Sequence, residues 1–362
     1  MTPDPSDSPE NPTKADTLIS VVVVNLDGGE MLNESLESVF AQTWPNVEVI
    51  LVDNASSDDS MERAEARFGD RLVTIHNDHN NGFAKGNNQA FAVAEGEWVF
   101  LLNNDAVMEP TALEELMKFL DGDPARSDED GGKIGMLACR VLRYSETNYF
   151  DSAGLLLYPD GVCRPRGWAE KDLGQFDRPD EVIAPHGCAA MLEKSMLDAL
   201  GGFDERFFAY LEDFDLGMRA QLCGWKCWYV PTAIVRHRKS ALFGNYSKFK
   251  AYHVERNRIY CAVKLLPRFI LFVSPLFTLN RYLMQFYAAR TQAGLSADFM
   301  KEYSFLQLAW ILTRAYCSAF SRLPSLIRDR HRLSKMRTLT TREWYGLISR
   351  FKLDAIELAL KF

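Results

Sequence analysis

The sequence predicts an α/β fold with a mostly parallel central sheet, followed by a helical C-terminal region. Between residues 18 and 105, short β-branched or apolar runs alternate with segments of helical periodicity. Runs this short indicate strands that are buried on both faces, as in parallel sheets. Beyond residue 246 the strand signals stop, and longer segments with helical character take their place. We therefore expect βαβ units with right-handed crossovers and an all-helical appendage.

Composition narrows the class of protein. The 362 residues are 47% hydrophobic, enough for one large core or two modest ones, and the net charge of -8 excludes a general nucleic-acid partner. Residues 1–16 are polar, Pro-rich and acidic without an apolar segment, so we expect a disordered leader and no signal peptide. The seven cysteines lack metal-site spacing, which is typical of reduced thiols in the cytoplasm.

The elements can be predicted in chain order from the apolar periodicity. Strands are expected at 18–24, 47–52, 72–76 and 98–102, and helices at 30–42, 60–68 and 81–94, with another beginning near Pro110. Polar clusters follow three of these strands: Asn25-Leu26-Asp27, Asp53-Asn54 and Asn103-Asn104-Asp105. Since parallel strands end at one rim, and ligands bind outside that rim in open α/β sheets, we expect a site there.

The cluster after the fourth strand has the composition of a cation site. Asp105 supplies a carboxylate, and Asn103 and Asn104 supply carboxamide oxygens. This combination suits a hard divalent cation and the phosphates that it would hold. The alternative is an Asx turn that leads into the next helix. No Gly-rich dinucleotide fingerprint follows the first strand, and the chain has no P-loop.

A second acidic cluster, Glu212-Asp213-Phe214-Asp215, provides a candidate general base. Neighbouring carboxylates raise one another's pKa and can bring one of them closer to neutral pH. The alternative is a solvated first turn of a helix, where acidic residues are favoured, with Asp215 and Arg219 as an ordinary i,i+4 pair.

Eight segments together resemble the successive motifs of family 2 glycosyltransferases with the GT-A fold, and especially the bacterial rhamnosyltransferase-like branch. Each is weakly specific, but their order and spacing over roughly residues 18 to 240 are strongly so. The segments are Ile19–Asn25, Val52–Ser57, Asn81–Asn88, Leu101–Asp105, Gly187–Leu192, Gly201–Glu205, Phe207–Tyr210 and Glu212–Leu216.

The resemblance implies an inverting transfer of a hexosyl or deoxyhexosyl group, such as rhamnosyl, in cell-surface polysaccharide synthesis. The donor would be a dTDP-, UDP- or GDP-sugar, and the acceptor a glycan or lipid-linked glycan. Mg²⁺ or Mn²⁺ would meet the negative charge that develops on the diphosphate leaving group. The single displacement also needs a base on the far face of the sugar and forms no covalent enzyme intermediate.

The resemblance also implies roles for donor-binding residues. Asp53 matches the acidic residue that hydrogen-bonds the nucleotide base, and Asn54 follows it in the same motif. Asn25 and Asp27 lie where the family's first loop cradles the nucleoside, with Asp27 in place of a more usual Asn. Lys85 is positioned to approach the donor diphosphate, although an exposed Lys at a helix start is the plainer interpretation.

The remaining roles concern metal binding and catalysis. Asn103–Asp105 occupies the family's DXD position, so Asp105 is expected to carry most of the metal binding, with reduced affinity because only one member is acidic. His237 would complete the metal or diphosphate site, and its cationic neighbours suit a diphosphate. Asp213 would be the general base, with Glu212 as its modulator.

The predicted domains are a leader at 1–16, a GT-A domain at 17–245 and a helical region at 246–362. In the last, the apolar stretch 265–289 lies beside a cluster that includes Arg328, Arg330 and Arg332. Such a pair predicts peripheral contact with the cytoplasmic face of the inner membrane; a helical cap over the catalytic domain and a homodimer interface are equal alternatives. The longest uncharged run, 269–280, is too short to span a bilayer.

Two other functions stay open at this stage. A nucleotidyltransferase also uses an α/β sheet and a metal-held phosphate, but the missing Gly-rich phosphate loop disfavours it. A catalytically silent subunit that binds nucleotide sugar or glycan would differ from an enzyme in donor hydrolysis. The segment 134–185 is expected to be strand-rich and to face the acceptor, and Tyr158, Trp168 and Phe176 could stack on a sugar or simply pack.

Overall fold

The computed structural model describes residues 17–122, 132–238, 247–291 and 303–360, so the predicted leader lies outside the described residues. Its first half is a parallel sheet in the order β3-β2-β1-β4. The strands are β1 (Ile19–Asn25), β2 (Val47–Asp53), β3 (Leu72–His76) and β4 (Trp98–Asn103). Asn25 is paired with Asp53, and Val24 with Asn103. The three polar clusters therefore share one rim, as the sequence predicts.

The alternation of β1 explains why helices cover both faces of this sheet. Val21 and Val23 belong to one apolar core together with α1 (Gly29–Phe40) and α2 (Ser60–Phe68). Val22 points the other way and packs in a second core with α3 (Gly82–Val93). Because both faces of the strand are covered, Val21 to Val24 form a continuous β-branched run and do not alternate with polar residues.

The second half of the sheet mixes strand directions. A central strand, β11 (Ala189–Glu193), is antiparallel to both β4 and β6 (Lys133–Arg143), and β6 in turn is parallel to β12 (Trp225–His237). Shorter strands complete it: β5 (Ala106–Met108), β7 (Phe150–Ser152) and β10 (Asp180–Val182). A separate hairpin pairs β8 (Leu155–Leu157) with β9 (Cys163–Pro165). The segment 134–185 is thus strand-rich, as expected.

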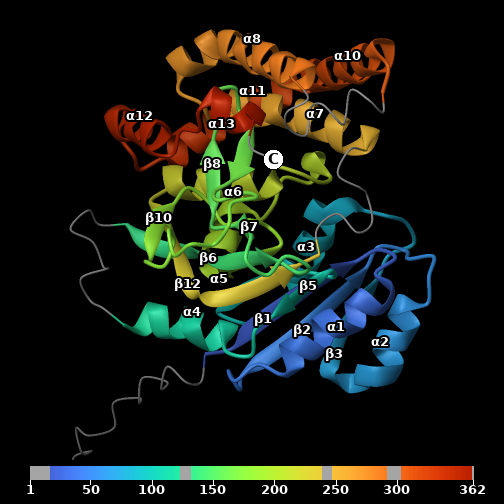
Figure 1. Cartoon of the computed structure of the whole chain (residues 1–362). Helices are drawn as coiled ribbons and strands as arrows, with labels where there is room; N and C mark the ends of the chain where they lie inside the picture. Colours follow the sequence, from blue (N-terminus) through green and yellow to red (C-terminus); the bar gives the residue numbers. More distant parts are fainter. Residues whose placement is uncertain (1–16, 123–131, 239–246, 292–302, 361–362) are drawn as a thin grey trace, which may run out of the picture.

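Three helices support this half, and the C-terminal helices lie beyond it (Figure 1). The supporting helices are α4 (Ala112–Asp121), α5 (Lys194–Leu200) and α6 (Glu212–Leu222). The C-terminal region comprises α7 (Lys248–Leu265), α8 (Arg268–Arg290), α10 (Phe305–Ser321), α11 (Leu323–Met336), α12 (Thr341–Arg350) and α13 (Ala355–Leu360). In the part of the chain with described coordinates, no helix combines the length and apolar character needed to cross a membrane.

A third apolar core joins the C-terminal helices to the sheet domain. It contains Phe214 and Met218 of α6, Leu157 of β8, Leu265 of α7 and Leu326 of α11. These side chains are almost fully buried. The inner helices therefore cover the end of the sheet domain that carries α6, as the helical-cap interpretation expects.

Candidate active site

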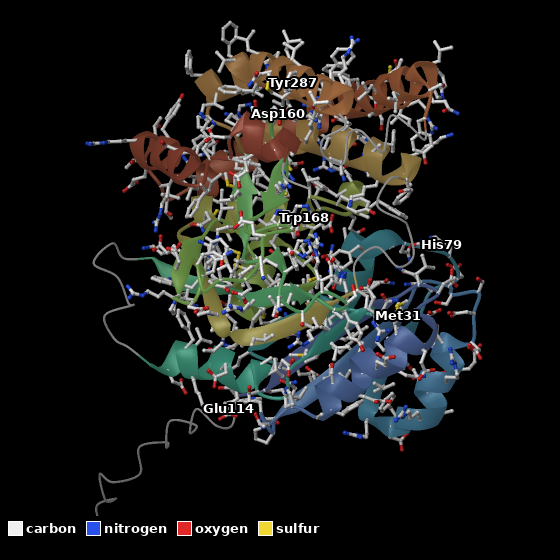
Figure 2. All side chains as sticks on the ribbon, in the orientation of Figure 1. Met31, His79, Glu114, Asp160, Trp168 and Tyr287 are labelled. Atoms are coloured by element: carbon white, nitrogen blue, oxygen red, sulfur yellow. The ribbon has the colours of Figure 1, made fainter. Side chains whose placement is uncertain are left out.

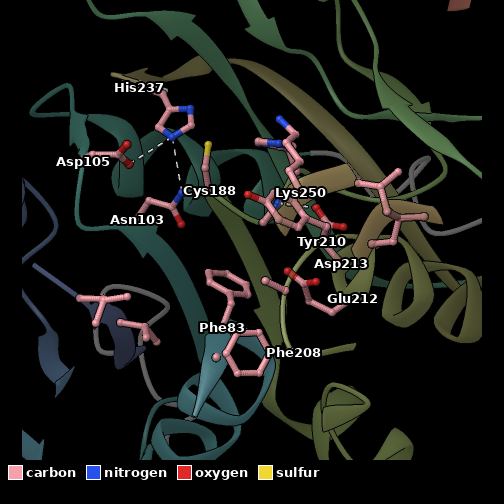
Figure 3. Close-up of a pocket in the computed structure, with 18 of the residues that line it drawn as sticks. Phe83, Asn103, Asp105, Cys188, Phe208, Tyr210, Glu212, Asp213, His237 and Lys250 are labelled. Carbon is pink, nitrogen blue, oxygen red and sulfur yellow. Dashed lines mark hydrogen bonds and ion pairs between the residues drawn. The ribbon is translucent and has the colours of Figure 1, made fainter. Parts of the chain in front are cut away.

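A cavity of about 370 Å³ opens at the carboxyl-end rim of the parallel strands. Figure 3 shows Asp105 and His237 on one side of it, and Glu212 and Asp213 on the other. In the first pair, Asp105 comes from the turn between β4 and β5, and His237 from the end of β12; the second pair comes from the first turn of α6. The structure thus brings the predicted metal and catalytic residues to the walls of a single cavity.

Asp105 and His237 form a buried pair. Nε2 of His237 lies 3.1 Å from Oδ1 of Asp105, and Nδ1 of the same ring lies 2.7 Å from Oδ2 of Asp151. Burial by itself would lower the pKa of His237, but the interactions with the carboxylates of Asp105 and Asp151 outweigh it and raise that pKa to about 10. Without a metal, the ring is therefore a cation held between two carboxylates.

These residues fit a divalent cation. Oδ1 of Asp105 is buried and accepts no hydrogen bond of good geometry from the described residues, and it lies 3.1 Å from Nε2 of His237. Carboxylate oxygen and imidazole nitrogen are both metal ligands, and a cation between them would replace the shared proton. Asp151 would then not bind the metal itself but would orient its ligand His237 through the hydrogen bond with Nδ1 of the ring.

The sequence analysis missed three residues beside this pair. Ligand atoms of Asp151, His186 and Cys188 all lie within 4.8 Å of one another, and all three residues line the cavity. Burial lowers the pKa of His186 and raises that of the Cys188 thiol well above its usual value, so both are neutral at pH 7.

The arginines on either side of His237 form ion pairs with other residues: Arg236 pairs with Glu109, and Arg238 with Glu34.

Glu212 and Asp213 have different surroundings, although they are adjacent. Glu212 is only 6% exposed, and burial together with the charges of Asp213 and Asp215 raises its pKa well above the usual range. Asp213 is half-buried and accepts hydrogen bonds from the backbone N–H groups of Gly187 at 2.9 Å and Phe214 at 2.7 Å. Glu212 is therefore not part of a solvated helix start, which contradicts that alternative.

Asp215 takes no part in the cavity. Its carboxylate lies 2.8 Å from Arg219, which is the predicted i,i+4 pair, and 2.6 Å from Lys264 of α7. The residue is fully buried. Asp215 is thus structural, and Glu212 and Asp213 are the two carboxylates of the cluster that remain candidates for catalysis.

The loop that leads into Glu212 is held in an uncommon conformation by α7. Tyr210 and Leu211 both have positive φ, at 71° and 69°. Nδ2 of Asn257 lies 3.0, 2.9 and 2.7 Å from the carbonyl oxygens of Phe207, Ala209 and Tyr210. Since left-handed backbone is unfavourable for these side chains, the hydrogen bonds from α7 are what keep the loop in place.

On the nucleotide side, Asn25 lies at the centre of a buried polar network. Its Nδ2 donates to Asp53 at 3.2 Å and to Ser60 at 2.9 Å, and its Oδ1 accepts from Asn104 at 2.9 Å. Gly28 packs so closely that a Cβ there would lie 2.3 Å from Oδ1 of Asn25. Hydrogen bonds therefore hold the predicted donor-binding residues Asn25, Asp53 and Asn104 together at the rim of the sheet.

The other predicted donor contacts lie around this network. Asn54 lines the cavity, whereas Asp27 and Lys85 do not. Asp27 has φ of 47°, a conformation that Asp and Asn tolerate, and accepts the N–H of Ser57 at 2.6 Å. Lys85 donates to Asn81 at 2.9 Å. Their roles toward a donor remain predictions.

One cation in the cavity was not predicted. Lys250, in the first turn of α7, lines the wall near Asp213 (Figure 3). Burial lowers the pKa of its ammonium group, against the opposing effect of Asp151.

The aromatic residues suggested for sugar stacking lie outside the cavity wall. Tyr158 packs on Phe277 at 6.0 Å between ring centroids, and Phe176 packs on Phe150 at 5.2 Å. Trp168 does not line the cavity either.

Comparison with known sequences decides the family. Residues 98–321, well over half of the chain, match "Glycosyl transferase family group 2", and residues 20–128 match "Glycosyl transferase family 2". The chain belongs to glycosyltransferase family 2. The matched range runs from β4 through the cavity into α10, so it includes both carboxylate clusters and His237.

Among its relatives, the N-acetylglucosaminyl-diphospho-decaprenol L-rhamnosyltransferase of Mycobacterium tuberculosis is 28% identical over 247 residues, which is 62% of this chain and 76% of that protein. The O-antigen biosynthesis protein RfbC of Myxococcus xanthus is 27% identical over 239 residues. That match covers 64% of this chain but only 18% of RfbC. This family 2 chain therefore resembles the rhamnosyltransferase branch in sequence.

A solved structure supports the fold. The crystal structure of Staphylococcus aureus TarS superposes with a TM-score of 0.51 at 16% identity, covering 92% of this chain and 55% of TarS. The likeness at this identity concerns the fold, which is GT-A, as the sequence motifs predict.

Proposed function

We propose that this protein is an inverting, metal-dependent glycosyltransferase. It moves a hexosyl or deoxyhexosyl group, such as rhamnosyl, from a nucleotide sugar to a lipid-linked glycan in cell-surface polysaccharide synthesis. The observation that carries the proposal is the cavity with Asp105 and His237 on one wall and Glu212 and Asp213 on the opposite wall. A displacement reaction needs this separation, because the leaving group and the attacking hydroxyl lie on opposite faces of the sugar.

The diphosphate side would be formed by Asp105 and His237. Their buried oxygen and nitrogen atoms fit Mg²⁺ or Mn²⁺ as described above. A bound divalent cation would stabilise the charge that develops on the departing diphosphate. Lys250 adds a basic side chain to the same cavity, on the wall near Asp213 (Figure 3), in a position that the sequence did not suggest.

The acceptor side would depend on Asp213. Its carboxylate takes the proton from the attacking hydroxyl as the new glycosidic bond forms and the bond to the diphosphate breaks. The N–H groups of Gly187 and Phe214 hold the carboxylate in one orientation. Burial, together with the charges of Asp213 and Asp215, raises the pKa of Glu212 well above its usual range, which favours the protonated form of this side chain beside Asp213.

The acceptor class is inferred from sequence likeness. The relative in Mycobacterium tuberculosis is named for transfer to a decaprenyl-diphosphate-linked sugar, and RfbC is named for O-antigen biosynthesis. We extend the same class, a sugar carried on a lipid diphosphate, to this chain. The base of the donor nucleotide, among dTDP, UDP and GDP, is the part of the proposal that needs direct measurement.

A two-part experiment tests the proposal. A thermal-shift panel of dTDP, UDP and GDP, each with and without Mn²⁺, should select one nucleotide whose stabilisation needs the cation; a ligand at a hundred times its dissociation constant adds about 2.7 kcal/mol. The matching nucleotide sugars are then incubated with a polyprenyl-diphosphate-linked acceptor. Transfer with inversion supports the proposal. Metal-dependent binding with neither transfer nor donor hydrolysis would instead identify a catalytically silent subunit.

A further inference from the structure

Helix α8 is oriented with its polar residues toward the protein. Ser274, Thr278 and Arg281 lie at helical spacing and are buried, with exposed fractions of 9% or less. Tyr282, next to Arg281, also points inward, where its hydroxyl lies 2.8 Å from Glu255 of α7. This arrangement is the reverse of the one expected for a helix on the surface of a globular domain.

The inward polar face is stabilised by buried ion pairs. Nε of Arg281 lies 2.7 Å from Asp160, and its Nη1 lies 2.8 Å from Glu255. Glu255 also accepts from Arg258 at 2.6 Å, so every member of this group is paired. Burial would raise the pKa of Glu255, but the two arginines outweigh it and lower that pKa to about 2. These buried ion pairs help to fix the orientation of α8, together with Ile270 and Leu271, which pack against the third core.

The outer face of α8 is apolar as a consequence. Its exposed positions recur every three or four residues along the whole helix, and Phe272 is 80% exposed and Leu276 68% exposed. We call this surface the α8 outer face; its residues are Phe269, Phe272, Leu276, Leu279, Leu283, Phe286 and Tyr287. Contiguous apolar exposure of this kind marks a binding surface.

The outer layer of helices also exposes apolar residues of α10 and arginine side chains. Figure 1 shows α8 and α10 together as the outermost layer, with α7 beneath them, and Figure 2 labels Tyr287 on that layer. Helix α10 exposes Leu306, Trp310 and Phe320. Neither α8 nor α10 contains an acidic residue, and exposed arginines, Arg268 and Arg290, lie at the two ends of α8.

We propose that the α8 outer face binds the surface of an anionic phospholipid bilayer. A long helix with Phe and Leu on one face, aromatic residues at the edge, and arginines at both ends has the composition of an interfacial membrane helix. The absence of acidic residues from α8 and α10 favours a negatively charged partner. The inference goes beyond the transfer reaction and holds whatever sugar is transferred.

The same geometry links the membrane-facing layer to the active site. Helix α7 is packed against both α8 and α10, and its first turn supplies Lys250 to the cavity wall. The hydroxyl of Tyr316 in α10 accepts a hydrogen bond from Arg258 of α7, the residue that directly follows Asn257. A bilayer on the α8 outer face would thus be separated from the loop of the general base by two helices, α8 and α7 (Figure 1).

Vesicle co-sedimentation of the full chain tests this inference, without donor or acceptor. The protein should sediment with vesicles of phosphatidylglycerol and phosphatidylcholine, and less with phosphatidylcholine alone. Replacing both Phe272→Glu and Leu276→Glu should lower the partition coefficient about tenfold or more, because two apolar anchors are lost and two negative charges gained. Phe272→Ser with Leu276→Ser gives a milder second variant should the first fail to fold.

Leu173→Glu is the matched control, since Leu173 is 79% exposed but lies in a loop of the catalytic domain. It should bind vesicles like the wild type, and the double variants should keep the wild-type Tm and metal-dependent nucleotide binding. Wild-type protein that does not sediment, or a double variant that sediments equally well, would overturn the proposal. A wild-type dimer that binds no vesicles and becomes monomeric on substitution would assign the face to a second copy instead.

Discussion

Nε2 of His237 lies 3.1 Å from Oδ1 of Asp105, although His237 ends β12 and Asp105 lies far away in the sequence, in the turn between β4 and β5. The antiparallel pairing of β12 with β5 places Ala106 opposite His237 and so fixes this contact. The pair is buried, so the negative charge of the Asp105 carboxylate has to be balanced nearby. A proton on His237 or a bound cation can balance it. This relationship is the structural basis for the predicted metal dependence.

The first prediction concerns Asp105. Asp105→Asn keeps the size of the side chain but removes the charge that a hard cation requires, so the Mn²⁺-dependent part of nucleoside-diphosphate binding should be lost. Calorimetric titration with and without Mn²⁺ measures this directly. Asp70→Asn, an exposed carboxylate outside the cavity, should leave the metal dependence unchanged. If nucleoside-diphosphate binding depended on Mn²⁺ equally in Asp105→Asn and wild type, Asp105 would not be a metal ligand.

A second prediction concerns the loop before the base. Asn257→Asp has the same shape but replaces the amide donor that faces three carbonyl oxygens with an acceptor. Loss of these buried hydrogen bonds should lower the free energy of unfolding by about 1–3 kcal/mol and slow transfer at saturating donor. Urea denaturation and single-turnover rates measure the two effects. If the variant matches Asn148→Asp, which changes an exposed Asn, α7 does not hold the loop.

The third prediction is a pH dependence from Glu255. Its pKa of about 2 in the folded protein lies below the usual value of 4.5, because the pairing with Arg281 and Arg258 outweighs burial. The corresponding stability is therefore fully present above pH 4.5 and is lost as the pH falls toward 2. Glu255→Gln should be less stable than wild type by about 3 kcal/mol at neutral pH, and the difference should shrink with acidification. A difference that stays constant from pH 5 to pH 2 would show that the carboxylate charge is not responsible.

Most of the catalytic half could be predicted from local sequence. Apolar periodicity is a property of neighbouring residues, so α2 and β3 have the bounds that the pattern predicts, and other elements differ by a few residues. The common rim of Asn25, Asp53 and Asn103 follows from parallel topology alone. The family motifs then indicated which rim residues matter.

The rest depends on contacts between distant segments. Asp151 reaches His237 because β7 pairs with β6, which no local pattern reveals. The direction that α8 faces could not be predicted, since its apolar and polar residues both recur at helical spacing. Its orientation is set by Asp160 and Glu255, which lie outside the helix in sequence.

The central claim is that Asp213 is the general base, with Glu212 as its modulator. Burial first and then nearby charge raise the pKa of Glu212, which favours its protonated form, and Gln resembles that form in shape and charge. That variant should therefore transfer sugar almost as well as the wild type. Asp213→Asn keeps the shape and can still accept from the N–H of Gly187, but it cannot take the proton.

Single-turnover transfer with saturating donor, compared among wild type, Glu212→Gln and Asp213→Asn, tests this claim most directly. The predicted result is a loss of about 10²–10⁴-fold for Asp213→Asn, with donor affinity almost unchanged. Transfer by Asp213→Asn at near the wild-type rate would contradict the assignment, and a large loss in Glu212→Gln alone would transfer the role to Glu212.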